Sequence, residues 1–209
     1  MFEIIKTLNE EDIKDDFVAI GNLIDESKEP FHAALIIKYN SNLFEFHYTS
    51  KSIEFDSINN DYFHKITKTI HQAEIPAFIA YCKSIKKNAK PIYGYFYGGE
   101  YYDNNGNHFS EKTTGERMTC VGFCLNVLKG FLEKDYIKYA DWDSSSHNNE
   151  DYLEKYAEKH ELDINDIQES HRRISPIEIL TSAFFNNIPI SKNEIETKLD
   201  EVKEYLLNY

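Results

Sequence analysis

The feature that most constrains the fold is a pair of strand-like runs joined by a short polar turn. Residues 30–39 and 43–49 are rich in β-branched and aromatic side chains, and the polar stretch Asn40–Asn42 separates them. This pattern predicts two antiparallel strands, and SIEF at 52–55 predicts a short third strand that follows them. A small antiparallel sheet is therefore expected early in the chain.

Apolar residues recur at helical spacing in three further segments before residue 142. They predict helices over 10–24, 74–88 and 120–134. Between the last two, the tyrosine-rich run at 91–102 predicts a strand. The Asn105–Gly106 step that follows this strand favours a tight hairpin turn.

The chain changes character after Trp142. Residues 144–151 (SSSHNNED) are polar and typical of a linker. Proline and serine helix starts and apolar spacing then predict four more helices, at about 150–160, 163–172, 176–186 and 191–207. The order of elements predicts an α+β fold, with a core over 1–142 and an acidic helical extension over 143–209 that packs on the core.

The formal net charge of −13 is concentrated in this extension. Residues 1–142 hold 16 basic and 21 acidic residues, whereas residues 143–209 hold 7 and 15. Such a surface repels phosphate backbones and anionic lipids, so the charge excludes nucleic acid and anionic membranes as expected partners. The acidic helices are typical of a solvated face, with a protein partner as the alternative.

The three cysteines are Cys82, Cys120 and Cys124, an odd and small number that does not form a disulfide framework. Their spacing is not typical of a zinc or redox site, and no nucleotide-binding motif occurs, so we expect no metal and no cofactor. The sequence shows no secretory signal and no run of 18 apolar residues. We therefore expect no membrane-spanning segment and a reducing, cytoplasmic setting.

Cys120 lies at the predicted start of a helix, where Thr119 is a suitable N-cap. Free backbone N–H groups and the positive end of the helix dipole favour a thiolate there and can hold an oxyanion. A nucleophilic thiol also needs a base within hydrogen-bonding reach and a third group that orients the base. We expect Cys120 as nucleophile, His32 as base and His47 as the orienting residue.

The two histidines fit this hypothesis through their positions in the predicted sheet. His32 lies near the start of the first strand, and His47 lies 15 residues later, near the end of the second. Antiparallel pairing with a short turn brings both rings to one end of the sheet. Glu45 or a tyrosine is an alternative orienting group. For Cys120, the alternative is a buried helical cysteine that packs as a small hydrophobe.

Two segments resemble the signature regions of a known family. FHAALIIKYNSNLFEFHYTS and MTCVGFCLNVLKGF are similar to those of circularly permuted NlpC-type papain-like proteins, a group that includes the lecithin retinol acyltransferase-like enzymes. RRISPIEILTSAFFN is similar to a helix often found downstream in them. The resemblance implies a permuted papain-like fold with His32 as base, His47 as orienting residue and Cys120 as nucleophile. Thr119 replaces the Asn that precedes the nucleophile in the acyltransferases.

These features predict a cysteine-nucleophile hydrolase or acyl transferase, with an amide (peptide or isopeptide) or an acyl ester as substrate. The alternative is a non-catalytic papain-like binding or regulatory module that uses its acidic helical surface. The run YGYFYGGEYY is either core packing or the lining of a cleft for an apolar or acyl group. In the second case, Gly98 and Gly99 let the substrate approach the backbone.

Overall fold

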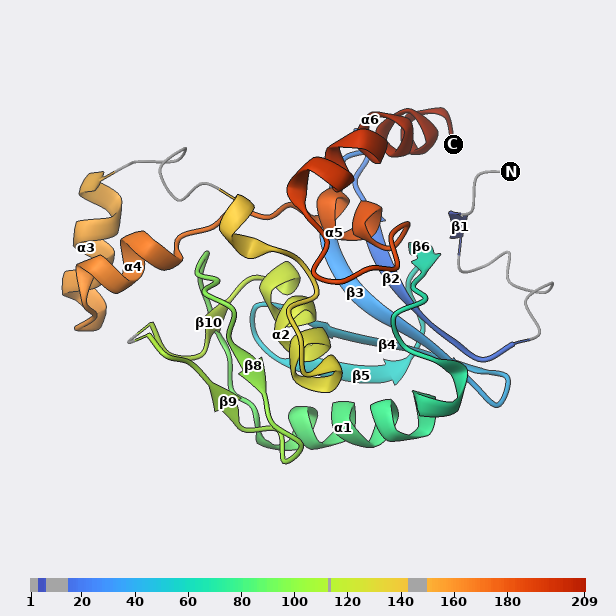
Figure 1. Ribbon diagram of the computed structural model, residues 1–209, viewed down its shortest axis with the longest axis horizontal. Helices are drawn as coiled ribbons and strands as arrows, with labels where there is room; N and C mark the ends of the chain where they lie inside the picture. Colours follow the sequence, from blue (N-terminus) through green and yellow to red (C-terminus); the bar gives the residue numbers. More distant parts are fainter. Residues whose placement is uncertain (1–3, 7–14, 113, 143–149) are drawn as a thin grey trace.

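The structure, a computed structural model, describes residues 4–6, 15–112, 114–142 and 150–209. The fold is α+β, as the sequence predicts, with one antiparallel sheet packed against helices and a helical C-terminal region (Figure 1). The strand order is β1-β6-β2-β3-β4-β5, with the two-residue β1 at the edge. The strands are β1 Ile5–Lys6, β2 Phe17–Ile24, β3 Pro30–Tyr39, β4 Asn42–Tyr48, β5 Ile53–Ser57 and β6 Phe63–Ile66.

The helices and the remaining short strands follow this sheet in the chain. The helices are α1 Ile75–Asn88, α2 Cys120–Leu132, α3 Glu150–His160, α4 Ile164–Ser170, α5 Pro176–Ser182 and α6 Lys192–Asn208. The short strands are β7 Ile92–Tyr93, β8 Tyr101–Tyr102, β9 His108–Phe109 and β10 Arg117–Met118. The helix predicted over 74–88 and the helix predicted to start at Cys120 are therefore confirmed.

The helix predicted over 10–24 is wrong where the structure describes this segment. Phe17–Ile24 form β2, which pairs with β6 on one side and with β3 on the other. Most of this strand is buried on both faces: Val18 and Ala19 belong to core clusters on opposite sides of the sheet. A strand covered on both faces lacks the alternation that marks a half-buried one, so its sequence pattern is ambiguous. Residues 7–14 lie outside the described residues.

The antiparallel meander predicted from residue 30 onward is confirmed. β3 pairs with β4, with Leu35 opposite Phe46, and β4 pairs with β5, with Phe46 opposite Phe55. Asn40 and Ser41 close the first turn with φ values of 49° and 63°. Positive φ at both central residues matches the right-handed twist of a two-residue hairpin. This tight turn fixes which residues of β3 and β4 lie near each other.

The single strand predicted over 91–102 is wrong. Its two ends form separate strands: β7 pairs in parallel with β10, and β8 pairs antiparallel with β9. The predicted turn between β8 and β9 is confirmed, because Gly106 has φ 78° and donates its N–H to Asp103 O at 2.9 Å. The two halves of the tyrosine-rich run therefore lie in different sheets.

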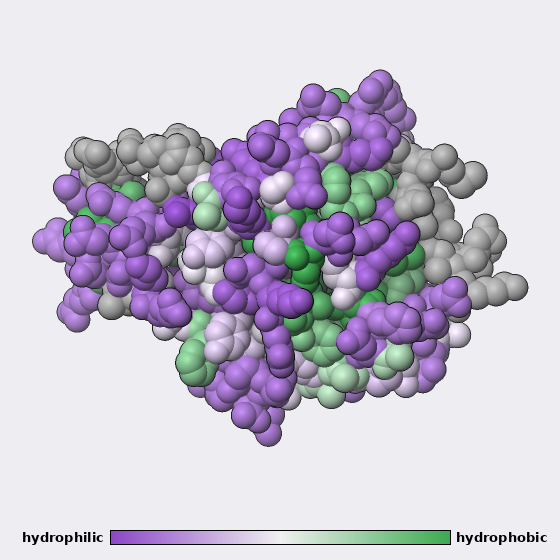
Figure 2. All heavy atoms as spheres, viewed as in Figure 1, coloured by the Kyte–Doolittle hydropathy of each residue, from purple (hydrophilic) through white to green (hydrophobic). Residues whose placement is uncertain are grey.

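The main core lies between the sheet and the helices. It joins Leu35 and Phe46 of the sheet to buried residues of α1, α2, α5 and α6. Phe123 of α2 is fully buried, and its ring centroid lies 5.1 Å from that of Phe46. The other face of the sheet carries Ile36 and packs on Tyr62, which precedes β6. Figure 2 shows hydrophilic residues over most of one face, with hydrophobic ones gathered near its middle.

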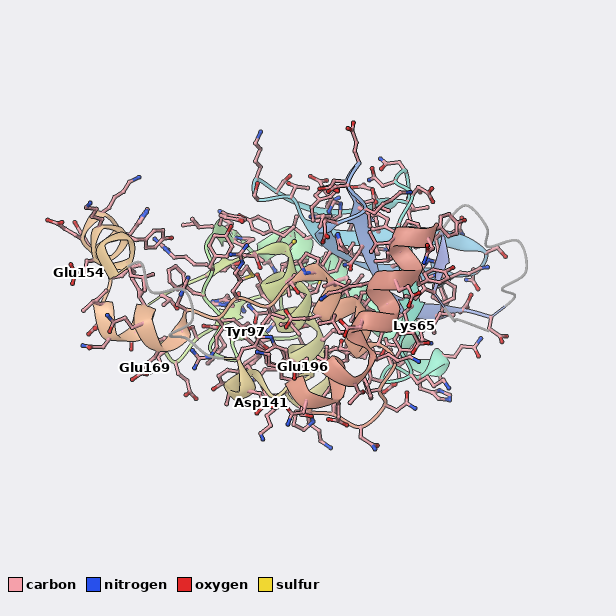
Figure 3. The ribbon with its side chains drawn as sticks, turned by 90° about the horizontal axis from the view of Figure 1, so that it is seen from above. Lys65, Tyr97, Asp141, Glu154, Glu169 and Glu196 are labelled. Carbon is pink, nitrogen blue, oxygen red and sulfur yellow. The ribbon has the colours of Figure 1, made fainter. Side chains whose placement is uncertain are left out.

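The C-terminal helices divide between two clusters. Buried residues of α5 and α6, Leu180 among them, belong to the main core, whereas α3 and α4 pack with Phe96 in a smaller one. Glu154 of α3 and Glu169 of α4 lie together at one end of the molecule (Figure 3). The four helices predicted after residue 150 are confirmed. Residues 144–149 of the predicted linker lie outside the described residues, and its last two residues begin α3.

Replacement of Phe123 by alanine is expected to destabilise the protein by about 3–5 kcal/mol, because it leaves a cavity in a packed core. The Phe123 ring contacts the rings of Phe46, Tyr48 and Tyr102. Urea unfolding monitored by circular dichroism measures the change. Phe109→Ala is the matched control: this ring is 55% exposed, so a loss below about 1 kcal/mol is expected. Equal losses would contradict the placement of Phe123.

Candidate functional site

Cys120 is the first residue of α2. Thr119 precedes it in extended conformation, and the Thr119 Oγ1 accepts a hydrogen bond from the Gly122 N–H at 3.2 Å. The predicted N-cap is thus confirmed. Cys120 is partly exposed, whereas Cys82 and Cys124 are buried, and none of the three forms a disulfide. Among the cysteines, Cys120 is therefore the one that a molecule from solution can reach.

Two opposing effects act on the Cys120 thiol. Burial is the larger effect and raises the pKa of this thiol above its ordinary value. The backbone N–H groups of Ala33, Val121 and Cys120 itself act in the opposite direction, since they stabilise the thiolate. Ala33 belongs to β3 and directly follows His32. The helix start thus places the sulfur against the strand that carries the predicted base.

The two histidines of the hypothesis contact each other. His32 Nε2 lies 2.7 Å from His47 Nδ1, and the two rings meet edge to face with centroids 4.9 Å apart. The β3–β4 register produces this contact: Leu35 pairs with Phe46, so His32 and His47 lie diagonally on one face of the hairpin. The structure thus brings together the two rings that the sequence predicted at one end of the sheet.

Both rings are neutral near pH 7. Burial, followed by the charge of His47, lowers the pKa of His32 to about 4. Burial also lowers the pKa of His47, and the carboxylates of Glu45, Glu54 and Asp56 oppose this effect without reversing it. In a neutral pair, one ring donates and the other accepts. If His32 donates from Nε2, its Nδ1 carries a free lone pair.

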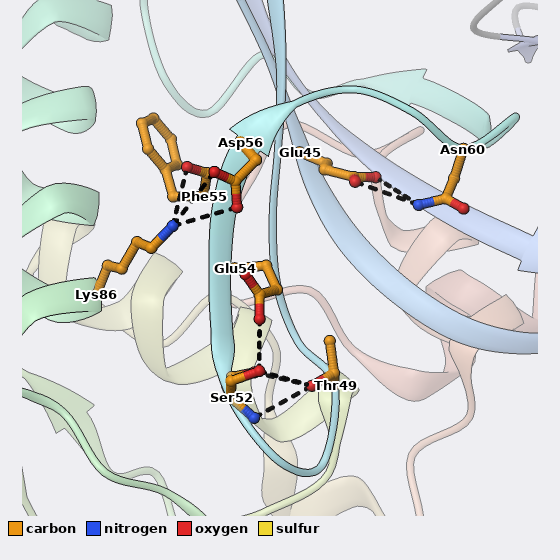
Figure 4. Close-up of polar contacts among 8 residues, drawn as sticks. All are labelled: Glu45, Thr49, Ser52, Glu54, Phe55, Asp56, Asn60 and Lys86. Carbon is orange, nitrogen blue, oxygen red and sulfur yellow. Dashed lines mark hydrogen bonds and ion pairs between the residues drawn. The ribbon is translucent and has the colours of Figure 1, made fainter.

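Glu45, the alternative orienting group, is engaged elsewhere. Its carboxylate accepts hydrogen bonds from Asn60 Nδ2 at 3.2 and 3.0 Å (Figure 4). The Tyr62 ring lies edge to face with that of His47, with centroids 6.5 Å apart. Burial and the Glu45 charge raise the pKa of Tyr62, so its hydroxyl stays protonated. The direct partner of His32 is therefore His47.

The direct Cys120–His32 contact that we expected is not formed. No hydrogen bond joins these two side chains, both of which belong to the described residues. Side chains alternate along β3, so Ala33 faces α2 while His32 starts from the opposite side of the strand. The Ala33 nitrogen, which lies at the sulfur, is only about 2.4 Å from the His32 Cα by standard bond lengths. The two residues are therefore close through the backbone, but their side chains start from opposite faces of β3 and form no pair.

A cleft of about 290 Å³ opens at Cys120. Aromatic residues line one side of it, and Tyr93 Oη and Tyr95 Oη form a hydrogen bond of 2.9 Å there. Arg172 and Arg173 line it as well. Neither arginine is among the site residues predicted from the sequence. Their only signal was a pair of adjacent cations in an otherwise acidic segment.

The tyrosine-rich run contributes to this cleft with one half only. Its first half supplies Tyr93 and Tyr95. Gly98 and Gly99 line a separate cavity with Glu100 and Lys129, and Gly99 has a left-handed φ of 81°. The glycines therefore do not bring a substrate to Cys120. Core packing, the other interpretation of the run, holds for Phe96, Tyr97 and Tyr102, which are buried.

Other classes of site have little support within the described residues. In that part of the chain, no three His, Cys, Asp or Glu side chains gather in a way that could hold a metal ion. None of the helices described is both long and apolar enough to cross a bilayer. Comparisons of the chain with family models, with curated proteins and with solved structures give no match.

Removal of the N-cap is expected to weaken the start of α2. Thr119→Ala should lower stability by about 1 kcal/mol, because the Gly122 N–H loses its acceptor. Thr119→Ser retains the hydroxyl and should remain within a few tenths of a kcal/mol of the parent. Chemical unfolding of the three proteins tests this; a Thr119→Ala variant as stable as the serine variant would exclude the cap.

Proposed function

We propose that the chain is a cysteine-nucleophile hydrolase or acyl transferase with a permuted papain-like arrangement, in which Cys120 attacks a carbonyl carbon. One observation carries the proposal. The only partly exposed thiol lies at a helix N-terminus, in a cleft, against the residue that follows a histidine held by a second histidine. The resemblance of the segments that contain them to NlpC-type proteins implies the same three residues.

In the proposed mechanism, the neutral His32 is the general base. Its Nδ1 takes the thiol proton while the sulfur forms a bond to the carbonyl carbon. The backbone N–H of Cys120 at the start of α2 stabilises the oxyanion. His32 then returns the proton to the leaving amine or alcohol, and a thioester remains on Cys120. Water, in a hydrolase, or another nucleophile, in a transferase, releases the acyl group.

His47 is the positioning residue of this mechanism. It accepts the hydrogen bond from His32 Nε2–H and so keeps the lone pair on His32 Nδ1. When His32 gains a proton, the same bond becomes charge-assisted and stronger. Formation of the Cys120–His32 pair requires a rearrangement at the start of β3 that brings His32 Nδ1 to the sulfur and keeps Nε2 on His47, because rotation of His32 alone would break its contact with His47. Catalytic hydrogen bonds are often long in the free protein and tighten when substrate binds.

The substrate of this chemistry is an amide, as in a peptide or isopeptide, or an acyl ester. The three unpaired cysteines support a reducing compartment such as the cytoplasm as the site of action. A second candidate function is a non-catalytic papain-like binding or regulatory module that uses its acidic helical surface. The unformed Cys120–His32 pair favours this alternative.

Alkylation of Cys120 distinguishes the two functions. Iodoacetamide at pH 6 should label Cys120 faster in the folded protein than in the urea-unfolded chain, because His32 removes the proton of a thiol whose ordinary pKa is near 8.5. His32→Ala should lower the rate by about 100-fold or more. Peptide mapping by mass spectrometry assigns the label, and the buried Cys82 and Cys124 serve as internal references.

His108→Gln is the matched control for this experiment. His108 is also buried enough to lower its pKa to about 4, but it lies on β9 and does not line the cleft. Its replacement should leave the labelling of Cys120 unchanged. If Cys120 of the folded parent labels no faster than in the unfolded chain, the enzyme is excluded and the binding module remains.

The pH dependence of this alkylation has an expected sign. His32 acts as base only when neutral, and its pKa is lowered to about 4, so the rate should fall as the pH drops through about 4. Above that, a plateau should extend toward the raised pKa of the thiol. Rates measured from pH 3.5 to 9, with circular dichroism to confirm folding, test this. A tenfold rise per pH unit throughout would indicate a bare thiolate without a base.

A further inference from the structure

The Arg172 side chain lines the Cys120 cleft, and some of its buried hydrogen-bond donors lack an acceptor. Its Nε and Nη1 atoms are buried and have no hydrogen-bond partner among the described residues. A guanidinium carries five N–H donors and stays charged at all physiological pH values, so buried donors without acceptors are costly. Such a group is expected to have an acceptor in the working state of the protein.

Backbone pairing holds this arginine in place. Phe96 forms an antiparallel bridge with His171, and the Tyr97 N–H donates to Ser170 O at 2.7 Å. These contacts join the segment that contains Tyr95 to the segment that continues into Arg172. Backbone hydrogen bonds therefore hold the segment before Arg172 next to the segment that supplies Tyr95 to the cleft.

Arg173 adds a second positive charge to the same cleft. Its guanidinium lowers the pKa of Tyr93, whereas the Cys120 thiol raises it, after the larger effects of burial and of Tyr95. Tyr93 therefore lies within electrostatic range of both the cation and the sulfur. No described residue that lines the cleft is acidic. The nearby Glu178 carboxylate bonds to Ser175 and Trp142 instead.

We propose that the Cys120 cleft binds a substrate that carries an anionic group, a carboxylate or a phosphate, and that Arg172 and Arg173 hold this group. The planar guanidinium fork matches both anions. Phe31, Tyr93 and Tyr95 are large rings at 57%, 45% and 38% exposure, and they offer an apolar surface for the rest of the molecule. This inference rests on the proposed function, because it assigns a substrate class to the same thiol.

Because the whole chain is acidic, the cleft with Arg172 and Arg173 is a place where an anion is favoured over the rest of the surface. A protein of net charge −13 repels anions in general, so an anion is favoured only where cations gather without acidic neighbours. The substrate class is therefore an amide or ester whose cleft-bound part is anionic. Because the acidic surface disfavours anionic lipids, a free carboxylate at a peptide end is the proposed source of this group, and a phosphate is the other outcome of the test.

Two alkylating agents of nearly equal size provide the first test. Iodoacetate carries a carboxylate and iodoacetamide does not, so the ratio of their rates at Cys120 reports the anion preference. In the folded parent, the iodoacetate rate divided by the iodoacetamide rate should be at least ten times its value in the unfolded chain. Arg172→Gln with Arg173→Gln should return it to the unfolded value, while iodoacetamide labelling stays fast.

Lys83→Gln with Lys87→Gln is the matched control, because it makes the same change in net charge on exposed positions of α1 outside the cleft. The ratio should not change in this variant. Fast labelling by iodoacetamide with no preference for iodoacetate would overturn the anion site and leave the proposed function intact. The single variant Arg173→Gln, at an exposed position, gives the answer if the double variant does not fold.

A binding measurement tests the site without thiol reactivity. Cys120→Ala protein is titrated with N-acetylphenylalanine, its neutral amide and phenyl phosphate by NMR. At least one anion should bind tenfold or more tightly than the amide, and the arginine variants should lose this advantage. The order of carboxylate and phosphate identifies the source of the anion. Equal affinities, or no binding at millimolar concentration, would overturn the proposal even if Cys120 proves unreactive.

Discussion

The contact on which the rest of the structure depends is that of α2 with the β3–β4 hairpin. Phe123 packs on the hairpin and fixes the helix, so Cys120 at the helix start lies against the backbone of Ala33. The same hairpin, closed by a tight turn, holds His32 and His47 at 2.7 Å. Because 87 residues separate His32 from Cys120, no local interaction sets their proximity. The packing of α2 on the hairpin does so.

The sequence predicted correctly those elements that are determined by residues next to them in the chain, such as turn and cap residues. The hairpin was predictable because two β-rich runs flank a polar turn, and the α2 start was predictable because Thr119 is an N-cap. β2 was taken for a helix because both its faces are buried, which removes the alternation that distinguishes a strand. The tyrosine-rich run was taken for one strand because its partners, β10 and β9, follow it in the chain and depend on tertiary pairing.

The candidate site divides in the same way. The diagonal contact of His32 and His47 follows from strand register, which the sequence pattern carries. The position of Arg172 at the cleft does not follow from any local sequence pattern, because it depends on the bridge between Phe96 and His171. The unformed contact of Cys120 with His32 was also beyond prediction. His32 starts from the face of β3 that does not pack on α2, and because both faces of β3 are buried, periodicity does not tell which of them α2 covers.

Burial acts in opposite directions on the two groups of the proposed pair but leaves both neutral. It raises the pKa of the acid, Cys120, and lowers the pKa of the base, His32, so proton transfer between them is uphill in the resting protein. In the proposed mechanism the transfer is coupled to formation of the carbon–sulfur bond, and negative charge then passes to an oxyanion held by backbone N–H groups. An unformed pair in the free protein is therefore compatible with catalysis. The pair needs to form only as an electrophile, whether a substrate held by Arg172 and its neighbour or an alkylating agent, reaches the sulfur. The thiol can therefore be protonated in the free protein and still react.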